Sequence, residues 1–133
     1  MNLKQTLKRH EGLRLKPYWC SAGKLTIGYG RNLDDVGITQ KEAEYLLDND
    51  IAMAGNDLMT VLPDLWKYSQ TRQAVLMNML FNLGKTRFVG FKKFIQAVKD
   101  EDWKGAAREM EDSKWYKQVG KRAKELQKAL LEG

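Results

Sequence analysis

The residue types that could carry out chemistry gather near the start of this 133-residue chain. Glu11 offers a carboxyl group that can give up a proton, Cys20 a thiol that is reactive when ionised, and Thr26 a hydroxyl that can hold a water molecule. His10 is a general base by residue type, but no partner motif accompanies it and we assign it no role. Taken singly, the other three are a solvated carboxylate, a packed cysteine and a strand-forming threonine. Only their combination could indicate a catalytic set.

The composition narrows the kinds of site that the chain can hold. Hydrophobic residues make up 43% and charged residues 30%, which is typical of a globular protein and excludes wholesale disorder. One cysteine cannot form an internal disulfide, and one histidine excludes a multi-histidine metal centre. We therefore expect a single domain with no metal and no cofactor.

The net charge of +6 is unevenly distributed along the sequence. Residues 4–16 and 114–128 are rich in lysine and arginine, whereas residues 34–57 are rich in aspartate and glutamate. Basic ends of this kind fit an anionic polymer, either nucleic acid or a charged cell surface or wall. A solvated helix face is the more ordinary interpretation, and charge alone favours it.

No targeting or membrane segment is evident in the sequence. Residues 1–10 contain no apolar core of a secretory signal, and no apolar run approaches the ~20 residues of a membrane span. We expect a protein made in the cytoplasm that needs another component to let it out.

The elements that must position Glu11, Cys20 and Thr26 are a helix and a hairpin. Leu3 and Leu7 follow the possible cap Asn2, which predicts a helix over residues 3–11 ending before Gly12. Residues 13–19 and 24–27 form two short apolar-alternating runs around a turn that contains Gly23. Pro17 places the first strand at the edge of the sheet.

The rest of the chain is predicted to be helical. Thr39 and Glu42 have capping-box spacing and begin a helix over about residues 39–62. We expect its inner side to carry Ala43, Leu46, Leu47, Ala54 and Leu58. An apolar, buried helix follows at 71–83, and shorter helices at about 91–99, 102–111, 113–118 and 121–132.

This pattern predicts an α+β fold that is mostly α, organised as a single catalytic domain over residues 1–133. Its parts are a small hairpin lobe at about 12–38, a connecting helix at about 39–62, and a helical lobe at about 63–133 that also includes the N-terminal helix. We expect a cleft between the lobes, where extended ligands bind.

Several segments together resemble one known family. They are Glu11–Lys16 with Tyr18, Leu25–Gly30, Gly37–Thr39 with 42–44, Asn78–Gly84, Gly90–Phe91, Trp103 with Ala106–Ala107, Ser113–Tyr116 and Arg122–Ala123. In order and spacing they resemble the phage-type lysozymes, the endolysins of tailed phages. The family pattern of Glu, eight residues, Asp or Cys, five residues and Thr is met by Glu11, Cys20 and Thr26.

The resemblance implies a lysozyme-like two-lobed fold and an endolysin. Such an enzyme hydrolyses the β-1,4 bond between N-acetylmuramic acid and N-acetylglucosamine in peptidoglycan, with inversion, and lyses the host cell. Glu11 would be the general acid if a cleft keeps it protonated, as burial does for carboxyl groups. Cys20 and Thr26 would handle the water or nucleophile. Chemical logic alone leaves inversion and retention open.

The resemblance also implies substrate-binding residues and a residue that acts on Glu11. Gly30 and Asn32 fall in the segment where the family contacts substrate, and Phe81 matches a cleft-lining phenylalanine, although it could equally belong to the core. Arg122 matches an arginine that pairs with the catalytic glutamate. Trp103 and Trp115 are better interpreted as core residues than as sugar platforms.

The sequence departs from the family at two places. The segment from Gly30 to Gly37 is short, which trims the small lobe relative to the largest members. Cys20 stands where many relatives carry aspartate. Its thiolate could activate water or attack carbon directly, or a neutral thiol could merely position water.

Three other functions remain open at this point. A lytic transglycosylase would cleave the same bond without water, and the Cys20–Thr26 pair argues against it. A basic helical nucleic-acid-binding module would need base-stacking aromatics or a recognition helix, and neither is evident. A non-catalytic wall-binding domain would not need Glu11 and Thr26.

The resemblance finally implies a partner and a place of action. The partner is bacterial peptidoglycan, with no nucleic acid and no stable membrane insertion, and the protein is expected to be a monomer. It would stay in the host cytoplasm until lysis and then reach the periplasm and cell wall through a holin pore.

Overall fold

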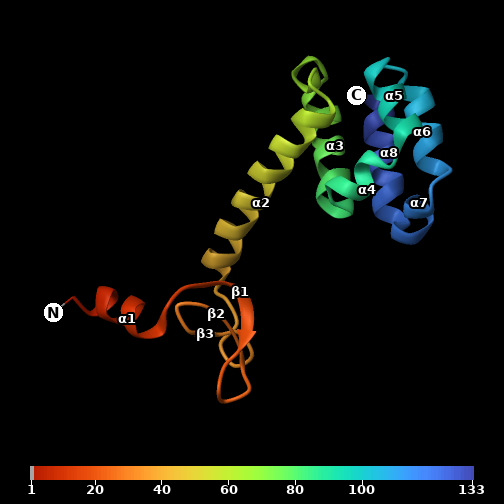
Figure 1. Ribbon diagram of the computed structural model, residues 1–133. Coiled ribbons are helices and arrows are strands. Elements are labelled where there is room, and N and C mark those ends of the chain that lie inside the picture. Colours follow the sequence, from red (N-terminus) through yellow and green to blue (C-terminus); the bar gives the residue numbers. More distant parts are fainter. Residues whose placement is uncertain (1) are drawn as a thin grey trace. The chain divides into compact units, whose positions relative to one another are not determined.

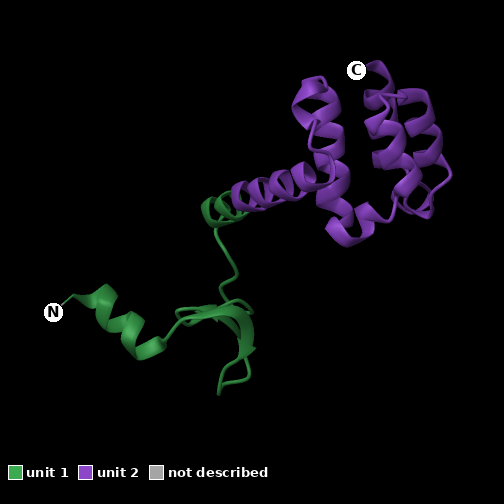
Figure 2. Ribbon diagram, turned by 45° about the horizontal axis from the view of Figure 1, so that its top comes forward, with its two compact units in different colours: residues 1–46 green, residues 47–133 purple. Residues whose placement is uncertain are grey.

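The computed structural model describes residues 2–133, which divide into two compact units, residues 2–46 and residues 47–133 (Figures 1 and 2). The first unit holds a helix and a small sheet, and the second is entirely helical. The architecture is mostly helical with one small antiparallel sheet, which confirms the predicted fold class. By its contacts the N-terminal helix belongs to the first unit. A single catalytic domain, with this helix in the helical lobe, stays a prediction.

The first unit begins with helix α1 (Leu3–Glu11), as predicted. The Asn2 side chain accepts a hydrogen bond from the backbone N–H of Gln5 at 3.1 Å, which satisfies one of the free donors at the helix start. Gly12 ends the helix with φ of 72°, a conformation that glycine adopts without steric penalty. Glu11 is therefore the last helical residue, next to the point where the chain turns into the sheet.

The sheet contains β1 (Arg14–Trp19), β2 (Leu25–Gly28) and β3 (Arg31–Asn32), antiparallel and in that order. Thr26 on the central strand lies opposite Tyr18 on β1 and Asn32 on β3. The strand that contains Pro17 lies at the edge, which confirms that prediction. The sequence analysis missed β3, because a strand of two residues shows no periodicity.

Helix α2 (Gln40–Val61) starts with the predicted capping box. The N–H of Glu42 donates to Thr39 Oγ1 at 3.1 Å, and the N–H of Thr39 donates to Glu42 Oε1 at 2.9 Å. Ala54 and Leu58 are buried, as expected. The prediction of an inner position is wrong for three other residues, Ala43, Leu46 and Leu47, because the core is reached only by the later turns of α2.

The second unit packs around helix α3 (Gln70–Leu83), which buries five apolar residues as its sequence predicts. The other elements of this unit are η1 (Leu65–Lys67), α4 (Lys85–Val89), α5 (Lys92–Lys99), α6 (Trp103–Glu111), α7 (Lys114–Val119) and α8 (Lys121–Glu132). Four of these match predicted helices to within about two residues. Elements η1 and α4 were not predicted, because each is too short to show an apolar period.

The core of the second unit consists of well-buried apolar side chains from all these helices. Phe88 and Phe94 meet edge to face with ring centroids 6.3 Å apart. The Trp115 indole is 3% exposed and donates its N–H to Asn82 Oδ1 at 2.7 Å, which satisfies the one polar atom that it buries. Trp103 packs against the same cluster. Trp115 is a core residue, as predicted, whereas Trp103 is partly buried at the margin of the core.

Candidate functional site

The Glu11 side chain lies against the backbone of the loop that follows β2. Gly30 has φ of 82°, and a Cβ atom added there would lie 2.9 Å from Glu11 Oε2. The absence of a side chain at Gly30 therefore allows the carboxylate its position. Nearby, the ammonium group of Lys8 lies 5.5 Å from the centre of the Tyr29 ring, so α1 contacts this loop at two places.

Cys20 occupies the turn that joins β1 to β2. Its N–H donates to the carbonyl of Lys24 at 2.9 Å, and its carbonyl accepts from the N–H of Gly23 at 2.9 Å. Gly23 has φ of 74°, which closes the turn. The thiol is half-buried and belongs to the part of the turn nearest Thr26.

The pKa of the Cys20 thiol lies below its ordinary value. Hydrogen bonding from the backbone of Lys24 is the largest cause, followed by the backbone of Ala22, and the Thr26 side chain adds to the effect. Burial acts in the opposite direction but is outweighed. Because hydrogen bonds to the charged form stabilise it, the turn favours the thiolate.

Thr26 is the only buried residue among residues 2–46. Its hydroxyl donates to the carbonyl of Lys24 at 2.9 Å, and its side chain is one cause of the lowered pKa of the Cys20 thiol. A hydroxyl has one hydrogen, so it donates either to the carbonyl or to a thiolate. The structure thus holds Cys20 and Thr26 within one hairpin, where the Thr26 side chain helps to lower the pKa of the thiol.

Asn32 lies on β3, and its side chain is engaged by the following loop. Its Oδ1 accepts the N–H of Asp35 at 2.9 Å, and its Nδ2 donates to Asp35 Oδ2 at 3.0 Å. These bonds fix the amide rather than leaving it free. Asn32 nonetheless lines the same hollow as Gly30.

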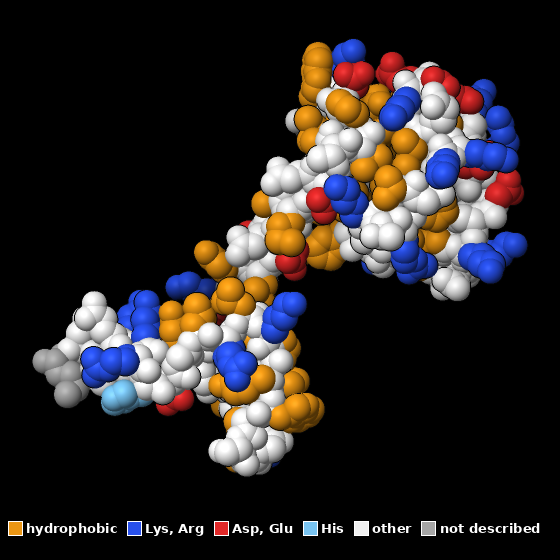
Figure 3. All heavy atoms as spheres, in the orientation of Figure 1, with side chains coloured by type: hydrophobic (Ala, Val, Ile, Leu, Met, Phe, Trp, Pro, Cys, Tyr) orange, Lys and Arg blue, Asp and Glu red, His pale blue; other side chains and the backbone are white. Residues whose placement is uncertain are grey.

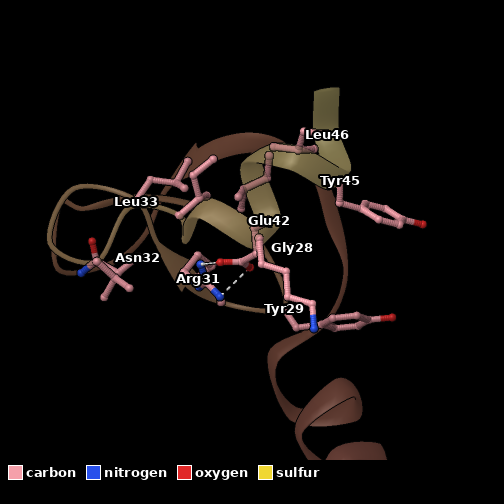
Figure 4. A pocket seen from close by; sticks show the side chains of 13 residues that line it. Gly28, Tyr29, Arg31, Asn32, Leu33, Glu42, Tyr45 and Leu46 are labelled. Atoms are coloured by element: carbon pink, nitrogen blue, oxygen red, sulfur yellow. Dashed lines mark hydrogen bonds and ion pairs between the residues drawn. The ribbon is translucent and has the colours of Figure 1, made fainter. Parts of the chain in front are cut away.

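That hollow measures about 1140 Å³ and lies entirely within the first unit (Figure 4). Its walls are mainly apolar and include Leu33 and Leu46, while Tyr29 and Tyr45 extend to one side of it (Figure 4). The polar feature inside is a two-pronged ion pair, in which Arg31 Nη1 and Nη2 each meet a Glu42 carboxylate oxygen at 2.8 Å. Hydrogen bonding to Arg31 lowers the pKa of Glu42 to about 2.

The second unit holds the other two predicted site residues. Phe81 and Arg122 both line a smaller hollow of about 450 Å³, and Phe81 is 45% exposed. Arg122 donates from Nε and Nη2 to Asn78 Oδ1, at 3.0 Å and 2.6 Å. Phe81 is thus a surface-lining residue rather than a core residue. The pairing of Arg122 with Glu11 stays a prediction.

Sequence reasoning missed three residues that shape these hollows. Arg31 and Glu42 are eleven positions apart, and no local spacing indicates that they would pair. Asn78 lies 44 positions before Arg122. The Thr39–Glu42 spacing indicated only the cap of α2, although the same carboxylate also binds Arg31.

The surface of the molecule carries both kinds of charge (Figure 3). Lysine and arginine side chains are spread over the visible face of the second unit, with acidic side chains among them (Figure 3). Within residues 2–133, no three histidine, cysteine or acidic side chains gather in a way that could hold a metal ion. Over the same residues, no helix has the length and apolar character to cross a membrane.

Comparison with known proteins gives a consistent picture. The family described as phage lysozyme matches residues 8–129. An endolysin of Acyrthosiphon pisum secondary endosymbiont phage 1 is 37% identical, over 84% of this chain and 75% of its own length. A probable T4-type lysozyme 2 of Dictyostelium discoideum is 29% identical, over 92% of this chain and 89% of its own length.

A further relative is much longer than this chain. The pre-baseplate central spike protein Gp5 of Enterobacteria phage T4 is 30% identical over 100% of this chain. The chain spans only 28% of the length of that protein.

Proposed function

The chain belongs to the phage lysozyme family and is by that membership a lysozyme, and we propose that it hydrolyses peptidoglycan. The bond proposed is the β-1,4 linkage between N-acetylmuramic acid and N-acetylglucosamine. The observation that carries this proposal is the first unit itself. One short segment supplies the Glu11 carboxyl group against Gly30, and a hairpin that holds the Cys20 thiol and the Thr26 hydroxyl.

Glu11 is proposed as the general acid. Its proton passes to the glycosidic oxygen as the bond from that oxygen to the anomeric carbon breaks. Because Gly30 has no side chain, the Glu11 carboxyl group fits against its backbone, next to the loop proposed to bind the sugar. Gly30 and Asn32 would contact that sugar, and Phe81 would pack against another part of the glycan.

Cys20 and Thr26 are proposed to act on the water molecule. The water oxygen forms the new bond to the anomeric carbon, and the water proton passes to the Cys20 thiolate. The lowered pKa of this thiol supports that role, because more of it is ionised near neutral pH than in free cysteine. When the Thr26 hydroxyl donates to the Lys24 carbonyl, its lone pairs are free to accept from the water. Attack by water on the face opposite the leaving group inverts the anomeric carbon.

Arg122 is proposed to pair with Glu11 and to hold its carboxyl group in place. Its guanidinium is itself fixed by Asn78, which accepts two hydrogen bonds from it.

The biological setting proposed is host-cell lysis by a phage or prophage. The protein would act as a monomer, remain in the host cytoplasm until a holin opens the membrane, and then reach the periplasm and wall. The match to a phage spike protein over the whole of this chain supports a second setting, in which the same hydrolysis serves a larger phage assembly.

The test is a digestion of purified peptidoglycan followed by mass analysis of the sugar ends. Hydrolysis adds one water and leaves reducing N-acetylmuramic acid ends. Anhydro ends, lighter by one water, would instead indicate a transglycosylase, and new N-acetylglucosamine reducing ends would indicate cleavage of the other linkage. Either of these two products would contradict the proposal.

A further inference from the structure

Arg31 occupies a position between two parts of the proposed site. The residue before it, Gly30, contacts the Glu11 carboxylate, and the residue after it, Asn32, lies opposite Thr26 in the sheet. The strand that carries Arg31 has only two residues. So short an edge strand has few ladder hydrogen bonds and needs other contacts to hold it in place.

The Arg31 side chain provides those contacts. Nη1 donates to the carbonyl of Gly37 at 3.0 Å. Nη1 also donates to Glu42 Oε1 and Nη2 to Glu42 Oε2, each at 2.8 Å (Figure 4). A two-pronged arginine–carboxylate pair fixes direction as well as distance. The guanidinium thus ties β3 to the loop carbonyl at Gly37 and to the first turn of α2.

The carboxylate partner is itself held in place. Glu42 Oε1 also accepts the N–H of Thr39 at 2.9 Å, and the Glu42 N–H donates to Thr39 Oγ1. The side chains of the pair are 35% and 41% exposed, so a large contribution to the free energy of unfolding is not expected. What the network supplies is geometry.

We propose that Arg31, held by Glu42, is a positioning residue that keeps the Gly30–Asn32 segment in register against Glu11 and Thr26. The proposal rests on the proposed function, since it assigns Arg31 a part in the same reaction. Arg31 does not act on substrate itself. A shift of β3 by a fraction of an ångström would move Gly30 against the Glu11 carboxylate and disturb the strand opposite Thr26. Misplacement of about 1 Å can lower a rate by ~10²-fold.

The test measures kcat and KM on solubilised peptidoglycan for Arg31→Gln, Glu42→Gln and the double variant. Glutamine at 42 keeps the capping box, which accepts either residue, and removes only the charge partner. We expect each single variant to lower kcat by about tenfold with little change in KM. The double variant should lose no more than either single variant, because both break one interaction.

The matched control is Lys85→Gln, which removes a different exposed ion pair, to Asp57 at 4.0 Å in the second unit. It should keep wild-type kcat, which separates a positioning role from a general effect of losing charge. If Arg31→Gln is unfolded at the assay temperature, Arg31→Lys decides. Lysine keeps the charge but cannot form the two-pronged contact, so a folded Arg31→Lys protein should show an intermediate kcat.

A folded Arg31→Gln or Arg31→Lys protein with wild-type kcat would overturn the inference, as would strictly additive losses in the double variant. The failure of the proposed function is distinguishable from these outcomes. If wild-type protein releases no reducing ends, the proposed function fails. If wild type is active and Glu11→Gln is not, but the Arg31 variants match wild type, only the role of Arg31 fails.

Discussion

The two units of this protein are held together in different ways. Among residues 2–133, every buried hydrophobic side chain belongs to the second unit, whereas the first unit buries only Thr26. The first unit instead depends on backbone turns at glycine, on the Arg31–Glu42 pair and on side-chain bonds to backbone. The residues proposed for catalysis lie in the unit without an apolar core. The proposed catalytic residues thus lie in the first unit, whose geometry is set by directional polar contacts. The buried apolar surface that stabilises the fold lies in the second unit.

The sharpest contrast between the units is expected from deleting a large side chain. Phe88→Ala removes a fully buried ring from the second unit and should lower the free energy of unfolding by about 3–5 kcal/mol. Leu15 in the first unit is 81% exposed, so Leu15→Ala should change the free energy of unfolding by less than about 0.5 kcal/mol. Denaturant unfolding measures both. Equal losses would contradict the division of labour between the units.

Substitution of Cys20 tests whether the turn between β1 and β2 takes part in the hydrolysis. If its thiolate accepts the water proton, Cys20→Ser should lower hydrolysis by about a hundredfold, because a hydroxyl is rarely ionised near neutral pH. Wild-type activity should rise with pH through the pKa of the thiol, which lies below its ordinary value. Cys20→Asp should stay active and work at lower pH, since the reference pKa of aspartate is ~3.9.

A chemical probe adds a control to this prediction. Thiol alkylation should inactivate the wild type and spare Cys20→Asp. A fully active Cys20→Ser protein with an unchanged pH profile would show that Cys20 only fills the turn and that Thr26 orders the water.

Gly30→Ala is expected to have a smaller effect on activity, because it adds backbone strain and a close contact with Glu11. Alanine there would take φ of 82° and place its Cβ 2.9 Å from Glu11 Oε2. Gly84→Ala is the matched control, because its φ of 80° is nearly the same and nothing lies within 4 Å of the added Cβ. Both variants should lose about 1–3 kcal/mol of stability from backbone strain. Only Gly30→Ala should also lose activity, by about tenfold, in initial rates of wall clearing.

The smallest effect is expected from the pH dependence of the Arg31–Glu42 pair. The pKa of the Glu42 carboxyl group, about 2 in the folded protein, lies below the ordinary ~4.3 of a glutamate in the unfolded chain. The pair therefore stabilises the fold fully above pH ~4.3, and that contribution is lost as pH falls toward 2. Melting curves of Glu42→Gln and wild type should differ slightly at pH 6 and converge near pH 2. A gap that widens at low pH would contradict this sign.

Much of the fold could be predicted because its signals are local. Asn2 and Gly12 bracket the first helix, and Thr39 with Glu42 begins the long one, since caps depend on neighbours within three or four residues. The apolar run at 71–83 predicts its own burial. Element β3 escaped prediction because two residues carry no period.

The exposed start of α2 escaped prediction for a different reason. Leu46 and Leu47 are apolar, and apolar residues on a helix are normally assigned to its inner side. Here they line hollows in the surface of the first and second unit respectively. Periodicity shows which positions share a face, but not whether another element covers that face.

The candidate site also has one part that the sequence predicts and another that it does not. Spacing along the chain and family resemblance were enough to nominate Glu11, Cys20 and Thr26. The contact of Glu11 with Gly30 and the bonding of Arg31 to Glu42 arise from tertiary geometry, which spacing does not encode.

The central claim is that the first unit carries the acid of a wall hydrolase, and Glu11→Gln tests it most directly. The amide has the shape of the acid but cannot give up a proton to the leaving oxygen. Release of reducing ends from purified peptidoglycan should fall by about 10²–10⁴-fold, with the melting temperature unchanged. A folded Glu11→Gln protein that keeps more than about a tenth of wild-type turnover would contradict the account, because general acid catalysis contributes more than that.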